Sequence, residues 1–228
     1  MEQLPLRNRG DHGEYLIYHP KRVRVCVGGQ VVHCDSLKGN QDPYVWSDRF
    51  LHTFCHATQM TAKVGHFNFW DSGDSWPKFS ALYCDLVFVV NEIADWHDRN
   101  WMDEDDSIVD SPIAYMDHYQ WVNRGQHRFK SEWRVRRTLK ADPAKSFQLQ
   151  SLENELPDIV PLLSQDGISI EEVQSRFRAG CASKPMPLDR NQVNQLYGKV
   201  LDLPGRKLFG ADLKLLRAAP DFPPNQGG

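Results

Sequence analysis

The sequence predicts an α+β fold, with a mixed or antiparallel sheet at its core, flanking helices and a helical C-terminal portion. Three observations predict this class. Polar and apolar residues alternate in short segments near the start, a continuous apolar run occupies 79–93, and helical periodicity begins after Pro157. The chain has 228 residues, of which 40% are hydrophobic, so it is long enough to bury a continuous core.

The first segments have the alternation of strands. The predicted strands are 15–18, 22–27 and 30–33. The pair Gly28-Gly29 is typical of a hairpin turn, so we expect a small antiparallel meander. Asp42-Pro43 is typical of a helix start, and apolar residues follow it at helical spacing. We therefore expect a helix from there to about Met60.

The middle of the chain predicts two further strands. The run 79–93 is rich in β-branched and aromatic residues, which favours a central, buried strand. Residues 131–140 alternate again. One face would carry Trp133, Val135 and Leu139, and the other Arg134, Arg136, Thr138 and Lys140. This segment is therefore predicted to be a strand with one basic face.

The last third has the apolar spacing of helices, interrupted by Pro and Gly. The predicted helices lie within 159–163, 170–177, 193–203 and 208–216. We interpret 1–150 as an α+β core domain that carries the site, 151–219 as a helical portion packed on it, and 220–228 as a disordered tail.

Composition excludes several classes of protein. The formal net charge of −3 excludes a uniformly basic coat for nucleic acid, so any polyanion must meet a local patch. Five cysteines without a CxxC pair argue against disulfides and zinc ribbons. No apolar run approaches the ~20 residues of a membrane-spanning helix, and the start lacks a signal peptide's apolar stretch. We expect a cytoplasmic protein.

The densest group of chemically capable residues lies in two neighbouring segments. It consists of Asp117, His118, Tyr119, Trp121 and His127. A carboxylate, two imidazoles and two aromatic rings can supply a general base, its partner and a stacking platform. The alternative is that both rings are core residues and that Asp117 is a cap or an ion-pair member.

A second group follows a predicted strand and enters a polar turn. Its members are Asn68, Trp70, Asp71, Asp74 and Trp76. Such a loop can line a pocket, with Asp71 or Asp74 as a candidate carboxylate. The sequence Asp-Ser-Gly-Asp is also an ordinary turn composition, which favours the structural alternative.

A metal site is the weaker interpretation of two other patterns. His52, Cys55 and His56 would share one face of the predicted helix, but no second pair of ligands accompanies them. The acidic run 103–106 lacks the glycine and the alternation of a calcium loop. Because the common nucleotide, dinucleotide and zincin motifs are also absent, we expect no metal and no cofactor.

A local basic stripe stands out on this acidic chain. It comprises Arg124, Arg128, Lys130, Arg134, Arg136, Arg137 and Lys140, interleaved with Trp121, Phe129 and Trp133. Such a stripe can follow a phosphate backbone while the aromatic rings hold an unstacked base. The alternative is an exposed strand whose charges protect the edge of a sheet.

Residues 106–150 resemble bacterial proteins with nucleotide modification associated domains, and the resemblance extends over about 15–150. It implies a phage-defence DNA glycosylase that excises a modified base, such as α-glucosyl-hydroxymethylcytosine, and leaves an abasic site. Asp117 would then be the carboxylate, His118 or His127 the donor to the departing base, and Tyr119 and Trp121 the stacking walls. The second group, including Asn68 and Trp76, would bind sugar hydroxyls.

Two functions from other classes remain open. A non-catalytic reader would capture the modified base in an aromatic cage without releasing it. A partner protein would instead associate through an exposed apolar face of its C-terminal helices. The candidates for that face are Ile170, Val173, Phe177, Val193, Leu196 and Tyr197.

Overall fold

The computed structural model describes residues 13–18, 23–34, 45–46, 51–53, 61–74, 78–96, 136–150, 155–177 and 185–221. The strands are β1 (Glu14–Tyr18), β2 (Val23–Val27), β3 (Gln30–Cys34), β4 (Val45–Trp46), β5 (Leu51–Thr53), β6 (Phe67–Gly73), β7 (Leu82–Trp96), β8 (Arg136–Ala141), β9 (Phe147–Gln150), β10 (Met186–Leu188) and β11 (Arg206–Phe209). The helices are α2 (Val160–Gln165), α3 (Ile170–Arg176), α4 (Arg190–Asp202) and α5 (Gly210–Arg217). The predicted α+β class is confirmed.

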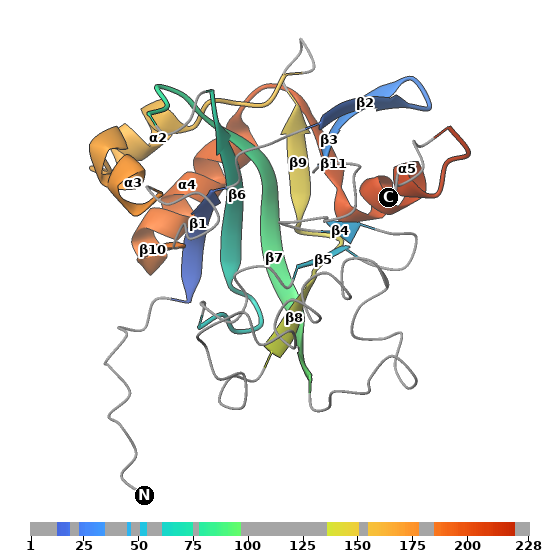
Figure 1. Cartoon of the computed structure of the whole chain (residues 1–228), viewed down its shortest axis with the longest axis horizontal. Helices are drawn as coiled ribbons and strands as arrows, with labels where there is room; N and C mark the ends of the chain where they lie inside the picture. Colours follow the sequence, from blue (N-terminus) through green and yellow to red (C-terminus); the bar gives the residue numbers. More distant parts are fainter. Residues whose placement is uncertain are drawn as a thin grey trace, which may run out of the picture.

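A mixed sheet forms the centre of the described structure (Figure 1). Its main path runs β10-β1-β6-β7-β8-β5-β4, and β9 joins β7 to β11 beside that path. The pairing of β1 with β6 is parallel, whereas the other pairings are antiparallel. The long apolar run predicted as a central strand is β7, which pairs with β6 on one side and with β8 and β9 on the other.

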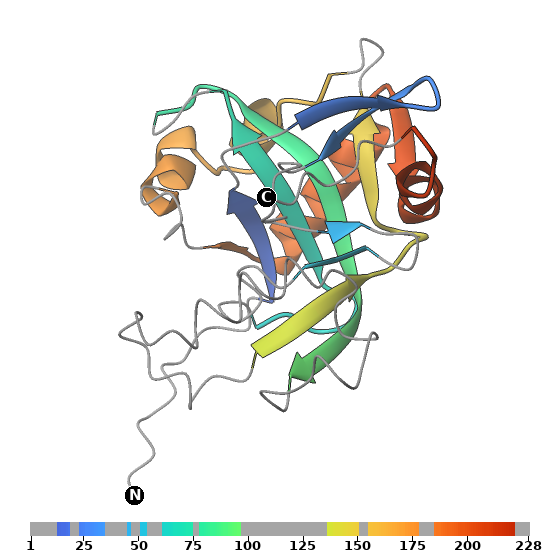
Figure 2. The same ribbon diagram turned by 45° about the vertical axis from the view of Figure 1, so that its right-hand side comes forward.

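The sheet separates two hydrophobic cores because strand side chains alternate between its faces. On one face, β1, β6 and β7 pack against the helices α2, α3 and α4. On the other face, the same strands pack with the β2–β3 hairpin and with α5. Figures 1 and 2 show α4 behind the sheet and the hairpin on the opposite side. We call these the helix-covered face and the hairpin face.

Glutamine side chains of β9 attach the hairpin to the sheet. The Gln148 amide accepts from His33 N at 2.8 Å and donates to His33 O at 2.6 Å. The Gln150 amide donates to Val31 O and accepts from Gln30 Nε2. These amides bond the β3 backbone as a neighbouring strand would, and they satisfy backbone groups that would otherwise be buried without partners.

A β-bulge changes which face β7 presents to each core. The register with β6 shifts between Trp70 and Asp71, so Trp70 pairs with Leu86 but Asp71 pairs with Cys84. Cys84 belongs to the helix-covered core, whereas Leu86 belongs to the hairpin core. In a regular strand two residues with this spacing lie on one face, so the extra residue Asp85 accounts for their opposite directions.

The β2–β3 hairpin and its Gly28-Gly29 turn are confirmed, since both glycines have positive φ (55° and 75°). The predicted meander is wrong for the first strand, because β1 pairs with β6 and β10 instead of β2. The helix predicted up to Met60 is also wrong for its described residues, since 45–46 and 51–53 are strands. Their backbones pair within the sheet, and this pairing overrides the local helical spacing.

Three of the C-terminal helices match the predicted segments closely, and α5 follows a strand that the periodicity missed. Capping explains two of the starts. Ser169 accepts from Glu172 N before α3, and Asp189 forms a capping box with Gln192 before α4. Two short strands, β10 and β11, also lie within 151–219 and extend the sheet through β1 and β9.

The exposed apolar face proposed for association does not exist as predicted. Four of its six candidates are buried in the helix-covered core, namely Val173, Phe177, Val193 and Leu196. Ile170 and Tyr197 are partly buried against the same core. The association hypothesis therefore loses its basis. Among the described helices, none is both long and apolar enough to cross a membrane.

Candidate functional site

The register of three central strands builds a small patch on the hairpin face, which we call the Asn68 face. Tyr15 of β1 and Phe88 of β7 flank Asn68 of β6, and Ile17 and Leu86 flank Trp70 in the same way. His66 continues the row, because it accepts from Val90 N at 2.9 Å just before β6 begins. The Asn68 face thus consists of Tyr15, Ile17, His66, Asn68, Trp70, Leu86, Phe88 and Val90.

Asn68 is the polar centre of this patch. Its side chain is fully buried, at 0% exposure. Within the described part of the chain, neither its Nδ2 nor its Oδ1 has a hydrogen-bond partner. An unsatisfied buried amide costs about 1–3 kcal/mol of folding free energy, so an apolar residue at this position would make the protein more stable. A buried polar group without a partner in the protein marks a place where a ligand can supply one.

Aromatic rings surround the Asn68 amide. Tyr15, Trp70 and Phe88 all belong to the hairpin core, and all are buried. The Tyr15 ring is held at its tip, because Thr61 N donates to Tyr15 Oη at 3.0 Å. An amide between flat apolar rings can bind a planar ligand by its polar edge while the rings contact its faces.

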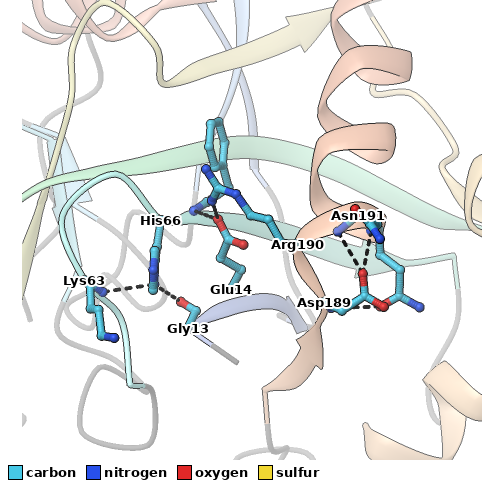
Figure 3. Close-up of polar contacts among 9 residues, drawn as sticks. Gly13, Glu14, Lys63, His66, Asp189, Arg190 and Asn191 are labelled. Atoms are coloured by element: carbon cyan, nitrogen blue, oxygen red, sulfur yellow. Dashed lines mark hydrogen bonds and ion pairs between the residues drawn. The ribbon is translucent and has the colours of Figure 1, made fainter. Parts of the chain in front are cut away.

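His66 lies at the end of the same row and is partly exposed. Its ring leans over Gly13, as Figure 3 shows. A Cβ on Gly13 would lie 1.9 Å from His66 Nδ1, so only glycine allows this ring position. Since a Cβ at Gly13 would share the face of Tyr15, the His66 ring is on the Asn68 face.

Glu14 and Arg190 make an ion pair on the other side of β1 (Figure 3). Glu14 is buried and also accepts from Phe67 N at 3.3 Å, while the Arg190 guanidinium lies over the Phe67 ring. This pair joins the start of α4 to the sheet. It is a structural contact of the helix-covered face and not part of the Asn68 face.

Asp71 was a candidate carboxylate, and the structure buries it in β6 on the helix-covered face. Its partner in the register is Cys84, so the thiol and the carboxylate are cross-strand neighbours. Burial, together with the negative charge of Asp71, raises the pKa of the Cys84 thiol. Asp71 lies on the opposite face from Asn68, so the two do not form one site.

Asp74 was the other candidate carboxylate of this group, and it stabilises a turn. Its carboxylate accepts from Ala81 N at 3.0 Å, from Ser80 N at 2.8 Å and from Ser80 Oγ at 2.7 Å. These hydrogen bonds lower the pKa of Asp74 from 3.8 to about 2. A carboxylate held in this way favours the turn interpretation over catalysis.

The predicted basic face of 131–140 is wrong where the structure describes it. Thr138 and Lys140 are buried, and Lys140 Nζ makes an ion pair with Glu92 at 2.9 Å. Lys140 faces its register partner Glu92 across the strand pair, and β8 lies between β7 and β5, so its charges do not protect a sheet edge either. Arg136 begins this strand. Lys140 is therefore not available as a DNA contact.

Several predicted site residues lie outside the described part of the chain. They are Trp76, Asp117, His118, Tyr119, Trp121, Arg124, His127, Arg128, Lys130 and Arg134. Cys55 and His56 lie outside it as well, whereas His52 is in β5. Among the described residues, no group of three or more His, Cys, Asp or Glu side chains could hold a metal ion.

Of the predicted site residues, the structure brings Asn68 and Trp70 together and separates them from Asp71 and Asp74. Sequence reasoning missed Tyr15, His66 and Phe88 as their neighbours. The alternation of 66, 68 and 70 was a usable signal, because it places three chemically capable side chains on one face of a strand. The cross-strand neighbours depend on register, which the sequence does not contain.

No family model, curated protein or solved structure matches this chain.

Proposed function

We propose that this protein binds DNA, holds a modified base against the Asn68 face and hydrolyses its N-glycosidic bond. Excision of a base such as glucosylated hydroxymethylcytosine would leave an abasic site in phage DNA and serve antiviral defence. The observation that supports the binding step is the buried Asn68 amide, which lacks a partner among the described residues and is surrounded by aromatic rings.

The chemistry of a nucleobase fits this surrounding. An asparagine amide presents one donor and one acceptor side by side, and bases carry complementary pairs on their edges. A flipped base would gain these hydrogen bonds and contact aromatic side chains with its faces. A purely apolar ligand would leave the amide unsatisfied, so the site favours a planar ligand with a polar edge.

Hydrolysis needs groups beyond this patch. Water attacks C1′ of the deoxyribose while a carboxylate accepts its proton. The C–N bond breaks, its electron pair goes to the base, and a donor protonates the departing base. We assign the carboxylate to Asp117 and the donor to His118 or His127. Asp71 and Asp74 have no place in this scheme, because the first lies on the opposite face and the second holds a turn.

A non-catalytic reader is the second candidate function. It is favoured by the positions of both described candidate carboxylates, since Asp71 is buried on the opposite face and Asp74 accepts from Ser80 and Ala81. A reader would need only the Asn68 face and a basic surface for the phosphates. A cytoplasmic location is part of either proposal, in keeping with Cys26 and Cys84, which are free thiols.

Incubation with unmodified, hydroxymethylated and glucosylated DNA tests the proposal directly. After alkali treatment, we expect strand breaks and free base with one modified substrate only. Asp117→Asn should abolish breaks while DNA binding is kept, and Asn68→Leu should weaken base-dependent binding as well. Asp74→Asn is the matched control and should retain both.

Each other outcome has a clear meaning. DNA that shifts on a gel but stays intact would replace the glycosylase by the reader. DNA that neither shifts nor breaks, for any of the three substrates, would contradict both candidates. Strand breaks that persist in Asp117→Asn would refute Asp117 as the catalytic carboxylate, while the proposed reaction itself would stand.

A further inference from the structure

His66 is a second polar group on the Asn68 face, and one of its ring nitrogens has no hydrogen-bond partner among the described residues. It lies two residues before Asn68, so the two side chains project from the same side of the sheet roughly 7 Å apart. Its ring is partly exposed, whereas Asn68 is fully buried. Among the described residues, the hydrogen bonds of the His66 ring are made by Nδ1, and none of these residues bonds Nε2.

The Nδ1 side of the ring is anchored by two backbone groups of opposite kind. Lys63 N lies 3.1 Å from Nδ1 and donates to it, while Gly13 O lies 3.0 Å from Nδ1 and accepts from it when Nδ1 is protonated (Figure 3). Either neutral tautomer therefore keeps one of these bonds. As a result, Nε2 can present a hydrogen or a lone pair without releasing the ring.

We propose that His66 Nε2 is the second hydrogen-bonding contact for the ligand that Asn68 holds. Two polar contacts on one aromatic-lined face, one at its centre and one at its end, fit a planar heterocycle with hydrogen-bonding atoms on two sides, which is the chemistry of a nucleobase. This inference rests on the proposed base binding. It does not depend on whether the bound base is then excised.

A substitution at Gly13 tests the same His66 contact in a second way. A Cβ at this position would collide with the His66 ring, at 1.9 Å from Nδ1 and 2.0 Å from Cε1. Gly13→Ala should therefore displace the ring and move Nε2 without changing the imidazole itself.

Two amide substitutions separate the roles of the two ring nitrogens. His66→Asn places an amide near the position of Nδ1 and removes the Nε2 contact. His66→Gln places an amide near the position of Nε2 and removes the Nδ1 anchor. A ligand role predicts that Gln retains function and Asn loses it, whereas a purely structural role predicts the reverse.

The assay compares two labelled oligonucleotides by fluorescence anisotropy. One carries 5-hydroxymethylcytosine at a single position, and the other carries an abasic site there. The ratio of their dissociation constants measures the contribution of the base. For His66→Asn and Gly13→Ala we expect this ratio to fall about tenfold, the loss of one good hydrogen bond, and for His66→Gln to stay within about threefold of the wild type. Thermal midpoints establish that each variant is folded.

Three results would overturn the inference. If His66→Asn keeps the wild-type ratio, His66 does not contact the base. If only Asn68→Leu lowers the ratio, base binding stands and the His66 contact fails alone. If the wild type binds both oligonucleotides equally, the proposed base binding fails and the His66 contact fails with it.

Discussion

Replacing Asn68 by leucine should make the protein more stable and at the same time less able to bind its ligand. Leucine has the same branching as asparagine and removes a fully buried amide that has no partner among the described residues. The relieved penalty is about 1–3 kcal/mol. For a chain of 228 residues, each kcal/mol raises the thermal midpoint by roughly 2–4 °C.

Calorimetry or thermal denaturation followed by circular dichroism measures this effect. We expect a rise of about 4–8 °C for a gain of about 2 kcal/mol. Leucine is larger than asparagine and could overpack the core, so Asn68→Val is needed to exclude overpacking as the cause of a lowered thermal midpoint. Asn68→Asp is the matched control of equal shape. It places a carboxylate in an apolar core and should destabilise at neutral pH, less so in acid where the carboxyl group is protonated.

The refuting result is a loss of stability in both apolar variants. If Asn68→Leu and Asn68→Val each lower the midpoint by more than about 3 °C, roughly 1 kcal/mol, the amide has a structural partner. The Asn68 face would then be an ordinary core, and the proposed base binding would lose its supporting observation.

Three further predictions concern other parts of the fold. The pKa of Asp74 is lowered from 3.8 to about 2, so the stability that its carboxylate contributes is present above about pH 4 and is lost as the pH falls toward 2. In thermal denaturation, Asp74→Asn should therefore be less stable than the wild type at pH 6, and this difference should shrink at pH 2.5. The Cys84 thiol is buried and has a raised pKa, so it should resist iodoacetamide in the native protein, whereas the exposed Cys26 should react. Peptide mapping by mass spectrometry measures both reactions, and equal labelling of the two thiols would contradict this prediction. Gln148→Ala should lower the free energy of unfolding by about 2–4 kcal/mol, because it leaves the backbone N–H and C=O of His33 without their partners. An unchanged hydrogen-exchange rate at the His33 amide would contradict the attachment of the hairpin by Gln148.

Local patterns predicted the elements whose stability comes from their own sequence. The run at 79–93 predicted the central strand, since a strand buried on both faces needs apolar residues throughout. Helix α4 follows from its apolar spacing and from the cap at Asp189. In contrast, the strands at 45–46 and 51–53 were mistaken for a helix. Such short strands are held by pairing with residues distant in sequence, which local spacing does not encode.

The candidate site was predicted in part. Asn68 and Trp70 were selected from their residue types, and the structure places both on one face. Asp71 was selected for the same reason, but strand alternation directs it to the opposite core. Asp74 shows that a carboxylate near a glycine can be a turn former, as the alternative interpretation of the sequence allowed. Burial and missing partners, which single out Asn68, are properties of the folded chain alone.

The bulge between β6 and β7 has a consequence for how this sequence can change. Upstream of it, Leu82 and Cys84 of β7 face the helices, and downstream of it Leu86, Phe88 and Val90 face the hairpin. The extra residue, Asp85, therefore determines which core each of these side chains enters. Loss of Asp85 would make Cys84 and Leu86 neighbours on opposite faces, so every side chain would keep its present core. Loss of another residue, such as Phe88, would instead exchange the two faces for the positions on one side of the deletion. A single deletion should therefore be tolerated at the bulge, whereas a deletion elsewhere in this strand should need a compensating change, even where each single substitution is harmless.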